Sequence, residues 1–202
     1  MIEKLIRDTR VALIINEMQV GNMQLLPALG KEVERRGTVK HIAKLAEKFR
    51  EKNLPVFHTP AMHRADFADL KRNTLISAMA YKAKAMIAGS EQAAYLPGLE
   101  PHASDLVSVR SSGLFCFQGT DLDARLRRMG VETIIAAGVS TNLGIPAIAF
   151  AATDLGYNVV VAEDCISSVD QAIHEMLIRE QLRLVATITT SAEVMALLDQ
   201  RP

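Results

Sequence analysis

Three positions beside short apolar segments carry residue types that chemistry would need. Glu17 follows the apolar segment 11–15, Arg110 ends the segment that begins at 106, and Gly144 comes shortly after the segment 133–137. A carboxylic acid can exchange protons, whereas an arginine stays charged and binds carboxylates through parallel hydrogen bonds. A glycine in the first turn of a helix leaves backbone amides open to an anion. Together the three residues predict an acid–base site for a small anionic molecule.

Each of these positions also has a purely structural interpretation. Glu17 and Arg110 can form an ordinary buried ion pair that joins two strand ends. Gly144 can serve the close packing of a helix on a sheet, or a bend linked to Pro146. Only the arrangement in space decides between the two interpretations.

Strands and helices must alternate along the chain to position these residues. Segments rich in Val and Ile, without polar alternation, predict strands buried on both faces at 11–15, 56–58, 106–109, 133–137, 159–162 and 184–188. Amphipathic periodicity predicts helices at 38–53, 120–129, 142–155, 168–182 and 191–199. Thr120 is the expected N-cap of its helix, and Gly130 and Gly156 stand where C-terminal glycines belong. This alternation predicts an α/β fold, with a six-stranded, mostly parallel sheet between two helical layers.

The segment 61–104 fits this alternation least well. A helix can run from 75 to 88, and the remainder reads as a long connection. In parallel α/β folds such connections form cavity walls or lids, although a loop that contacts another subunit is an equally open interpretation. Because open α/β sheets bind ligands beyond the carboxyl ends of their strands, we expect the site at that edge.

Composition limits the classes of function that need consideration. The chain has 202 residues, 49% of them hydrophobic, which predicts a single domain over 1–202 with a substantial core. Basic and acidic residues number 23 each, so no charge pattern indicates a nucleic acid or an anionic membrane surface as a partner. The apolar runs are too short to span a membrane, and the N-terminus lacks the core of a signal peptide. With two cysteines and no pairing pattern, the sequence favours a cytoplasmic protein.

The segment 131–146, VETIIAAGVSTNLGIP, followed by AFAATDLGY at 149–157, resembles the isochorismatase-like hydrolases. So do Glu17-Met-Gln and Gly119-Thr-Asp-Leu-Asp, and the resemblance extends from 11 to 198. It implies a Rossmann-like three-layer α/β/α fold with strand order 3-2-1-4-5-6, and a cis peptide bond between Val139 and Ser140.

Within this resemblance three key positions are altered. In the cysteine-hydrolase branch the nucleophilic cysteine stands at the position of Gly144, and the family's aspartate and lysine match Glu17 and Arg110. Counting from the other side of the loop would match Ser111 instead; strand register favours Arg110. True isochorismatases resemble this chain in having a glycine there, and their strand-one acid protonates a vinyl ether to which water adds. The resemblance therefore implies a hydrolase without cofactor or metal, with Glu17 as general acid and Arg110 and Gly144 completing the catalytic set.

Further residues near these strand ends are candidates for contact with a small-molecule substrate. They are Gln19, His58, Phe115, Phe117, Ser140, Asn142 and Leu143, the last with a backbone amide that can face an anion beside that of Gly144. His58 and His63, with Asp66, do not reproduce the metal ligands of nicotinamidase-like relatives. His41, His102 and His174 are expected to be solvated.

Two other functions stay open at this point. Loss of three catalytic residues fits a family member that only binds a small molecule or assembles with partners. An amidohydrolase that uses Cys116 is the third alternative, although no histidine beside Cys116 would generate its thiolate; Cys165 is expected to be structural. The apolar stripe near 147–155 predicts a homodimer or homotetramer.

Overall fold

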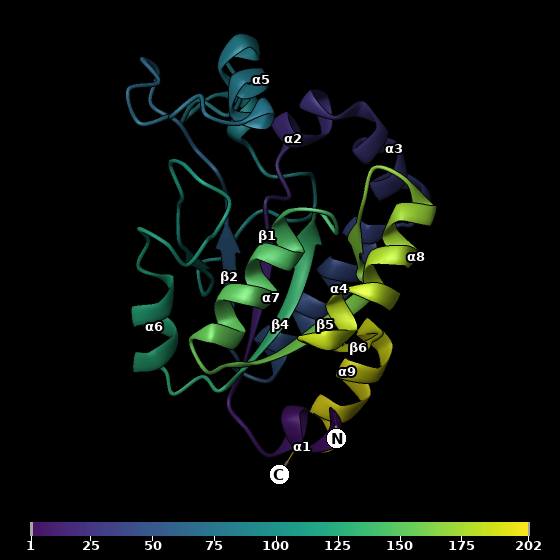
Figure 1. The fold of residues 1–202 in the computed structure, drawn as a ribbon. Coiled ribbons are helices and arrows are strands. Elements are labelled where there is room, and N and C mark those ends of the chain that lie inside the picture. Colours follow the sequence, from purple (N-terminus) through teal and green to yellow (C-terminus); the bar gives the residue numbers. More distant parts are fainter. Residues whose placement is uncertain (1, 202) are drawn as a thin grey trace.

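A six-stranded sheet forms the centre of the molecule (Figure 1). The computed structural model describes residues 2–201. The strands lie in the order β3-β2-β1-β4-β5-β6, and each neighbouring pair is parallel. They are β1 (Val11–Asn16), β2 (Val56–Thr59), β3 (Leu106–Val107), β4 (Thr133–Val139), β5 (Asn158–Ser167) and β6 (Thr187–Thr189). The predicted sheet and its strand order are confirmed.

Helices cover both faces of the sheet, with α7 in front of it and α4 behind it in Figure 1. The helices are α1 (Ile2–Arg7), α2 (Val20–Leu25), α3 (Pro27–Arg35), α4 (Thr38–Glu51), α5 (Leu75–Ala83), α6 (Leu122–Arg128), α7 (Gly144–Asp154), α8 (Gln171–Glu180) and α9 (Ser191–Asp199). Two short 3-10 helices are η1 (Glu91–Ala93) and η2 (Leu182–Leu184). The predicted three-layer α/β/α architecture is confirmed.

Alternate residues of β1 belong to two different cores, because successive side chains of a strand point to opposite faces. Leu13 and Ile15 pack with residues of α4 and α9, whereas Ala12 and Ile14 pack with residues of α6 and α7. All six residues of β1 are buried, which explains the absence of polar alternation in its sequence. The pairing of β1 with β4 also sets Asn16 opposite Gly138, so the carboxyl ends of these two strands lie side by side.

The structure differs from the sequence-based prediction mainly in short elements. α1, α2 and α3 have no counterpart among the predicted helices. α1 and α2 have six residues each, too few to show a clear amphipathic period, whereas α3 is amphipathic, with Leu29 and Val33 on its buried side, and the prediction missed it. β3 contains only two residues. The last strand begins at Thr187, because Leu184 closes η2.

The glycines predicted at the C-terminal ends of two helices are confirmed, whereas the predicted N-cap of α6 is not. Gly130 (φ +68°) and Gly156 (φ +90°) follow the C-caps of α6 and α7 in the left-handed conformation that glycine favours. The prediction of Thr120 as N-cap is wrong, because Asp121 takes that position. The Thr120 hydroxyl instead donates a hydrogen bond to the Cys116 carbonyl (2.5 Å).

The apolar stripe on α7 largely packs against the sheet. Ile148, Ala149 and Ala152 are buried, while Phe150 and Leu155 are partly exposed. Assembly into a homodimer or homotetramer stays a prediction. Among residues 2–201, no helix is long and apolar enough to cross a lipid bilayer.

Candidate functional site

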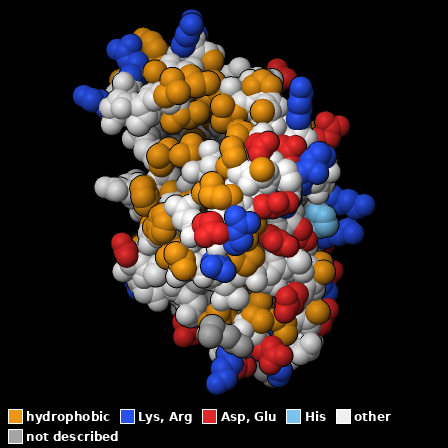
Figure 2. Space-filling model, turned by 45° about the vertical axis from the view of Figure 1, so that its right-hand side comes forward, with side chains coloured by type: hydrophobic (Ala, Val, Ile, Leu, Met, Phe, Trp, Pro, Cys, Tyr) orange, Lys and Arg blue, Asp and Glu red, His pale blue; other side chains and the backbone are white. Residues whose placement is uncertain are grey.

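A cavity of about 340 Å³ opens beyond the carboxyl ends of β1 and β4. Its floor is formed by Glu17 after β1 and by the turn 139–144 after β4. The connection 61–86, which contains α5, forms the opposite wall, so the long segment 61–104 lines a cavity as one of its two interpretations predicts. Hydrophobic side chains gather on the upper part of the molecule in Figure 2, the part to which α5 belongs.

Glu17 and Arg110 meet at the floor of this cavity. The Nη2 atom of Arg110 donates a hydrogen bond to Oε1 of Glu17. Only 4% of the Arg110 side chain and 19% of the Glu17 side chain are exposed, so the ion pair is largely shielded from water. The Arg110 amide donates to the Pro60 carbonyl (3.0 Å), and the Arg110 carbonyl accepts from the Met62 amide (2.9 Å). This backbone pairing brings Arg110 into the cavity lining, whereas Ser111 is not part of it.

The backbone of Glu17 turns sharply out of β1. Its φ of +52° lies in the left-handed region that residues other than glycine rarely adopt. Two hydrogen bonds to its carbonyl hold the turn, one from the Gln19 amide (2.8 Å) and one from Nδ2 of Asn22 (2.9 Å). The turn therefore fixes the carboxylate at the cavity rather than in the core beneath it.

Arg110 uses one guanidinium nitrogen to hold Glu17. Its Nε and Nη1 atoms are buried and have no hydrogen-bond partner among the described residues. Burial lowers the pKa of Arg110, but an arginine starts so far above neutrality that the guanidinium stays charged. A substrate carboxylate that binds Nη2 would compete with Glu17 for that atom. The geometry favours Arg110 as the residue that orients Glu17.

Position 144 leaves no space for a side chain. A Cβ atom on Gly144 would lie 2.4 Å from Nδ2 of Asn16 and 2.5 Å from the carbonyl oxygen of Val139. Asn16 is held there by its own bonds, donating from Nδ2 to the Val139 carbonyl (2.5 Å) and accepting at Oδ1 from the Thr59 hydroxyl (2.9 Å). A cysteine at this position would collide with backbone, so thiol chemistry at this turn would require a different local packing.

The backbone amides of the turn are only partly available. The Leu143 amide donates to the Ser140 carbonyl (3.1 Å), which removes one of the two amides expected to bind an anion. The Gly144 amide has no hydrogen-bond acceptor among the described residues. The peptide bond between Val139 and Ser140 is cis, as the resemblance predicts.

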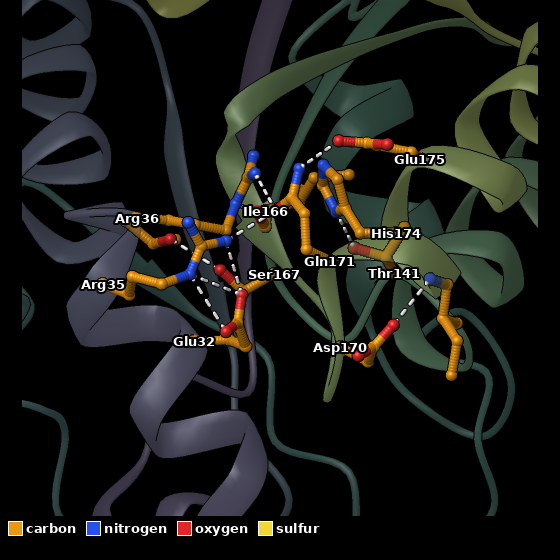
Figure 3. Close-up of polar contacts among 12 residues, drawn as sticks. Glu32, Arg35, Arg36, Thr141, Ile166, Ser167, Asp170, Gln171, His174 and Glu175 are labelled. Carbon is orange, nitrogen blue, oxygen red and sulfur yellow. Dashed lines mark hydrogen bonds and ion pairs between the residues drawn. The ribbon is translucent and has the colours of Figure 1, made fainter.

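A buried polar network supports this turn from behind (Figure 3). His174 of α8 is 3% exposed, and its Nδ1 atom lies 2.9 Å from the Thr141 hydroxyl. The Thr141 amide donates to the Ser167 carbonyl (2.9 Å). Burial and, secondarily, the positive charge of Arg36 lower the pKa of His174 to about 4. The expectation that His174 is solvated is therefore wrong, because α8 folds it inward against the turn.

The same network extends to α3. Arg36 donates to the Glu163 carbonyl (2.8 Å) at β5 and, together with Arg35, to Oε1 of Gln171 at the start of α8 (2.9 and 2.7 Å). Figure 3 shows these side chains converging between α3, β5 and α8. They tie the three elements together beside the turn 139–144.

Several predicted site residues lie outside the cavity lining. Gln19 is fully buried, and its amide donates to the carbonyls of Ala61 and Ala93 (both 3.0 Å). It therefore holds the cavity wall together from behind. Ser140 and Leu143 do line the cavity, whereas Asn142 is exposed and weakly accepts a bond from Ser168 (3.4 Å).

The two phenylalanines and the histidine predicted to contact a substrate lie outside the cavity lining. Phe115 is 40% exposed on the surface, and the ring of Phe117 lies 6.1 Å from that of Tyr157. His58 lies on the α4 side of the sheet, with Nε2 3.0 Å from Oδ2 of Asp105. Burial lowers the pKa of His58, which favours the neutral ring. None of these three residues lines the cavity.

Sequence reasoning missed several polar residues of the cavity. His63 is buried in its lining, and its Nδ1 atom lies 2.7 Å from the Ser111 carbonyl. A carbonyl can only accept, so Nδ1 of His63 is the donor in this contact. Lys71, Asn73 and Ser77 also line the cavity. Only the length of the connection 61–104 hinted at them.

The cysteines do not compensate for the missing thiol. Cys116 is 1% exposed and does not line the cavity, and burial raises its pKa to about 12. Cys165 is also buried, which raises the pKa of its thiol. Neither thiol supplies a thiolate at neutral pH. Among residues 2–201, no group of three His, Cys, Asp or Glu side chains is arranged to hold a metal ion.

Known proteins are similar to this chain in both sequence and architecture. Residues 11–193 match the isochorismatase domain. The isochorismatase family protein YecD of Escherichia coli O157:H7 is 30% identical over 184 residues, which is 91% of this chain and 94% of YecD.

Solved structures agree. An isochorismatase family protein from Desulfovibrio vulgaris superposes with a TM-score of 0.81 at 30% identity, over 95% of this chain and 99% of that one. A cysteine hydrolase from Pseudomonas syringae has a TM-score of 0.80 over 95% and 93% of the two chains, and at 20% identity it shows the fold alone. The coverage of the domain match and of these relatives leads to one conclusion: the chain belongs to the isochorismatase family.

Proposed function

We propose that this protein is an isochorismatase-like hydrolase that acts on a small carboxylate-bearing molecule without a cysteine nucleophile, with Glu17 as general acid. The proposal rests on the residues that line the floor of the cavity. Among the described residues that line the cavity, Glu17 is the only carboxylate, and it lies on the floor beside a turn that has no room for a thiol. Proton transfer from this carboxyl group is the chemistry that the cavity retains.

The reaction that suits this set is hydrolysis of a vinyl ether. Glu17, which is paired with Arg110 in the resting protein, first takes up a proton from solvent. It then donates this proton to the terminal vinyl carbon, and water adds to the resulting cation at the carbon that bears the ether oxygen. Glu17 recovers a proton from that water, and the hemiketal collapses to a ketone and an alcohol. General acid catalysis of this kind typically contributes 10²–10⁴-fold in rate. In this proposal Arg110 orients Glu17, and the Gly144 amide, which has no acceptor among the described residues, donates a hydrogen bond to an oxygen atom of the substrate.

A panel of isochorismate, simple vinyl ethers and amides tests the proposal. We expect turnover of a vinyl ether by the wild-type protein and loss of at least about 100-fold in Glu17→Gln, which keeps the shape but has no acid proton. Glu132→Gln changes an exposed carboxylate at the opposite edge of the sheet and should keep full activity. Activity that survives Glu17→Gln would contradict the assignment, and loss of activity in Cys116→Ser alone would support the amidohydrolase alternative.

A non-catalytic, small-molecule-binding or assembly role is the second candidate. The observation that favours it is the ion pair itself, because Arg110 and Glu17 satisfy each other without a substrate. Under this alternative no member of the panel is turned over, while a ligand still raises the melting temperature. Measuring turnover and thermal stabilisation on the same panel separates the two functions.

A further inference from the structure

One positive charge in the cavity has no counter-ion. The charged side chains of the lining are Glu17, Arg110 and Lys71, and the first two pair with each other. Lys71 forms no ion pair among the described residues. The described lining therefore carries one net positive charge, which belongs to Lys71 in the connection 61–86.

The acidic residues near Lys71 in the sequence are already engaged. Asp66 accepts both guanidinium bonds of Arg64 (2.9 and 2.8 Å) and a bond from the Ala68 amide (3.1 Å). Asp69 accepts from the Arg64 amide (3.1 and 3.3 Å). The loop thus uses its own carboxylates for its backbone and for Arg64, and leaves Lys71 available to a ligand.

The remaining lining describes the rest of that ligand. Leu25, Leu26, Leu29, Leu70, Ile76 and Met86 give the cavity a predominantly apolar wall. Apolar walls with a few placed polar groups bind molecules that combine an apolar body with a polar end. The charge of Arg110 is already paired with Glu17, so Lys71 carries the one charge in the described lining that lacks a partner.

We propose that Lys71 is the specificity-determining residue of this site and selects ligands with an apolar body and one carboxylate. The proposal rests on the proposed function only in placing the substrate in this cavity. The carboxylate binds the ammonium group of Lys71 near the connection 61–86, while the apolar body lies against α2, α3 and α5. This arrangement leaves the opposite end of the molecule at Glu17.

The neighbouring residue supplies a matched control. The guanidinium of Arg72 lies 4.3 Å from the centre of the Tyr81 ring, and Arg72 does not line the cavity. Lys71→Met and Arg72→Met remove the same charge from adjacent exposed positions, but only the first changes the cavity. Lys71→Arg keeps the charge and should retain binding.

Calorimetric titration with cinnamate and its neutral analogue cinnamamide tests the inference without requiring turnover. We expect cinnamate to bind at least about tenfold more tightly than cinnamamide, as one charge-assisted hydrogen bond implies. Lys71→Met should abolish that preference, Arg72→Met should keep it, and raising the salt concentration should weaken cinnamate alone.

Equal affinity for the two compounds, no binding of cinnamate at millimolar concentration, or an unchanged preference in Lys71→Met would each overturn the inference. A different set of results would contradict the proposed hydrolase activity. Cinnamate binding through Lys71 with no turnover of any vinyl ether would overturn the hydrolase and leave the role of Lys71 standing. Equal turnover of anionic and neutral vinyl ethers would support the hydrolase and overturn the role of Lys71.

Discussion

The side-chain amide of Asn16 occupies the space that a side chain at position 144 would need. A Cβ atom on Gly144 would lie 2.4 Å from Nδ2 of Asn16, and Nδ2 is itself bonded to the Val139 carbonyl. The two positions are 128 residues apart in sequence but adjacent at the carboxyl ends of β1 and β4. The packing around position 144 therefore excludes a cysteine side chain, and both Asn16 and the Val139 carbonyl contribute to this exclusion.

Gly144→Ala should destabilise the protein, because the added methyl group meets a backbone carbonyl that cannot move independently. We expect the free energy of unfolding, measured by urea denaturation, to fall by about 2 kcal/mol, as is usual for overpacking. Gly30→Ala is the control, since its new methyl group would lie 3.3 Å from Met23 and a helical alanine is favoured over glycine. A Gly144→Ala variant as stable as Gly30→Ala would contradict the steric account.

The ion pair of Glu17 and Arg110 should show strong coupling between its members. Glu17→Gln leaves a buried guanidinium unpaired, so we expect a loss of about 3 kcal/mol in the free energy of unfolding. The double variant Glu17→Gln/Arg110→Met should recover much of that loss, because the buried charge is gone. A double-mutant cycle by denaturant unfolding measures the coupling.

An exposed ion pair provides the comparison for that cycle. Arg64 and Asp66 are 66% and 56% exposed, so Asp66→Asn should barely change stability. If the cycle at Glu17 and Arg110 gives additive losses, the two side chains are not coupled in solution.

Stability should fall on mild acidification because of His174. Its pKa in the folded protein is lowered to about 4, below the ordinary value of about 6.5, so between these values the unfolded chain binds the proton more readily. The contribution of neutral His174 to the free energy of unfolding is therefore complete above about pH 6.5. It is lost as the pH falls towards 4, by up to about 3 kcal/mol. His58, whose pKa burial also lowers, acts in the same direction.

Urea unfolding at pH 7 and pH 4.5 checks this pH dependence. His174→Gln should lose less stability between the two pH values than the wild-type protein. His102→Gln removes an exposed ring and should retain the wild-type difference. An identical loss in wild-type and His174→Gln proteins would show that other groups account for the acid sensitivity.

Both thiols should be unreactive in the native protein. Cys116 and Cys165 are buried, and the pKa of Cys116 is raised to about 12 by that burial. A thiol reagent at pH 8 should therefore titrate none of the two cysteines before denaturation and both afterwards. Rapid reaction of Cys116 in the folded protein would restore the amidohydrolase alternative.

Much of this structure could be predicted from residue patterns, because the spacing of apolar residues indicates which positions are buried. Segments of Val and Ile without polar alternation predicted the parallel strands, and the same strands place Glu17, Arg110 and the turn before Gly144 at one edge of the sheet. The six-residue helices α1 and α2 were not predicted, because helices this short depend on packing for their stability and are too short to show an amphipathic period.

The sequence by itself determined the layers, the strand order through its family resemblance, and the family's altered residues at positions 17, 110 and 144. Only the tertiary structure decided that Arg110 binds Glu17, that Asn16 fills the space beside Gly144, and that Lys71 lies in the cavity while His58 lies behind the sheet. The physical reason is that periodicity reports which face of an element is buried. The direction of a polar side chain depends on partners far away in the chain, and these become neighbours only when the sheet forms.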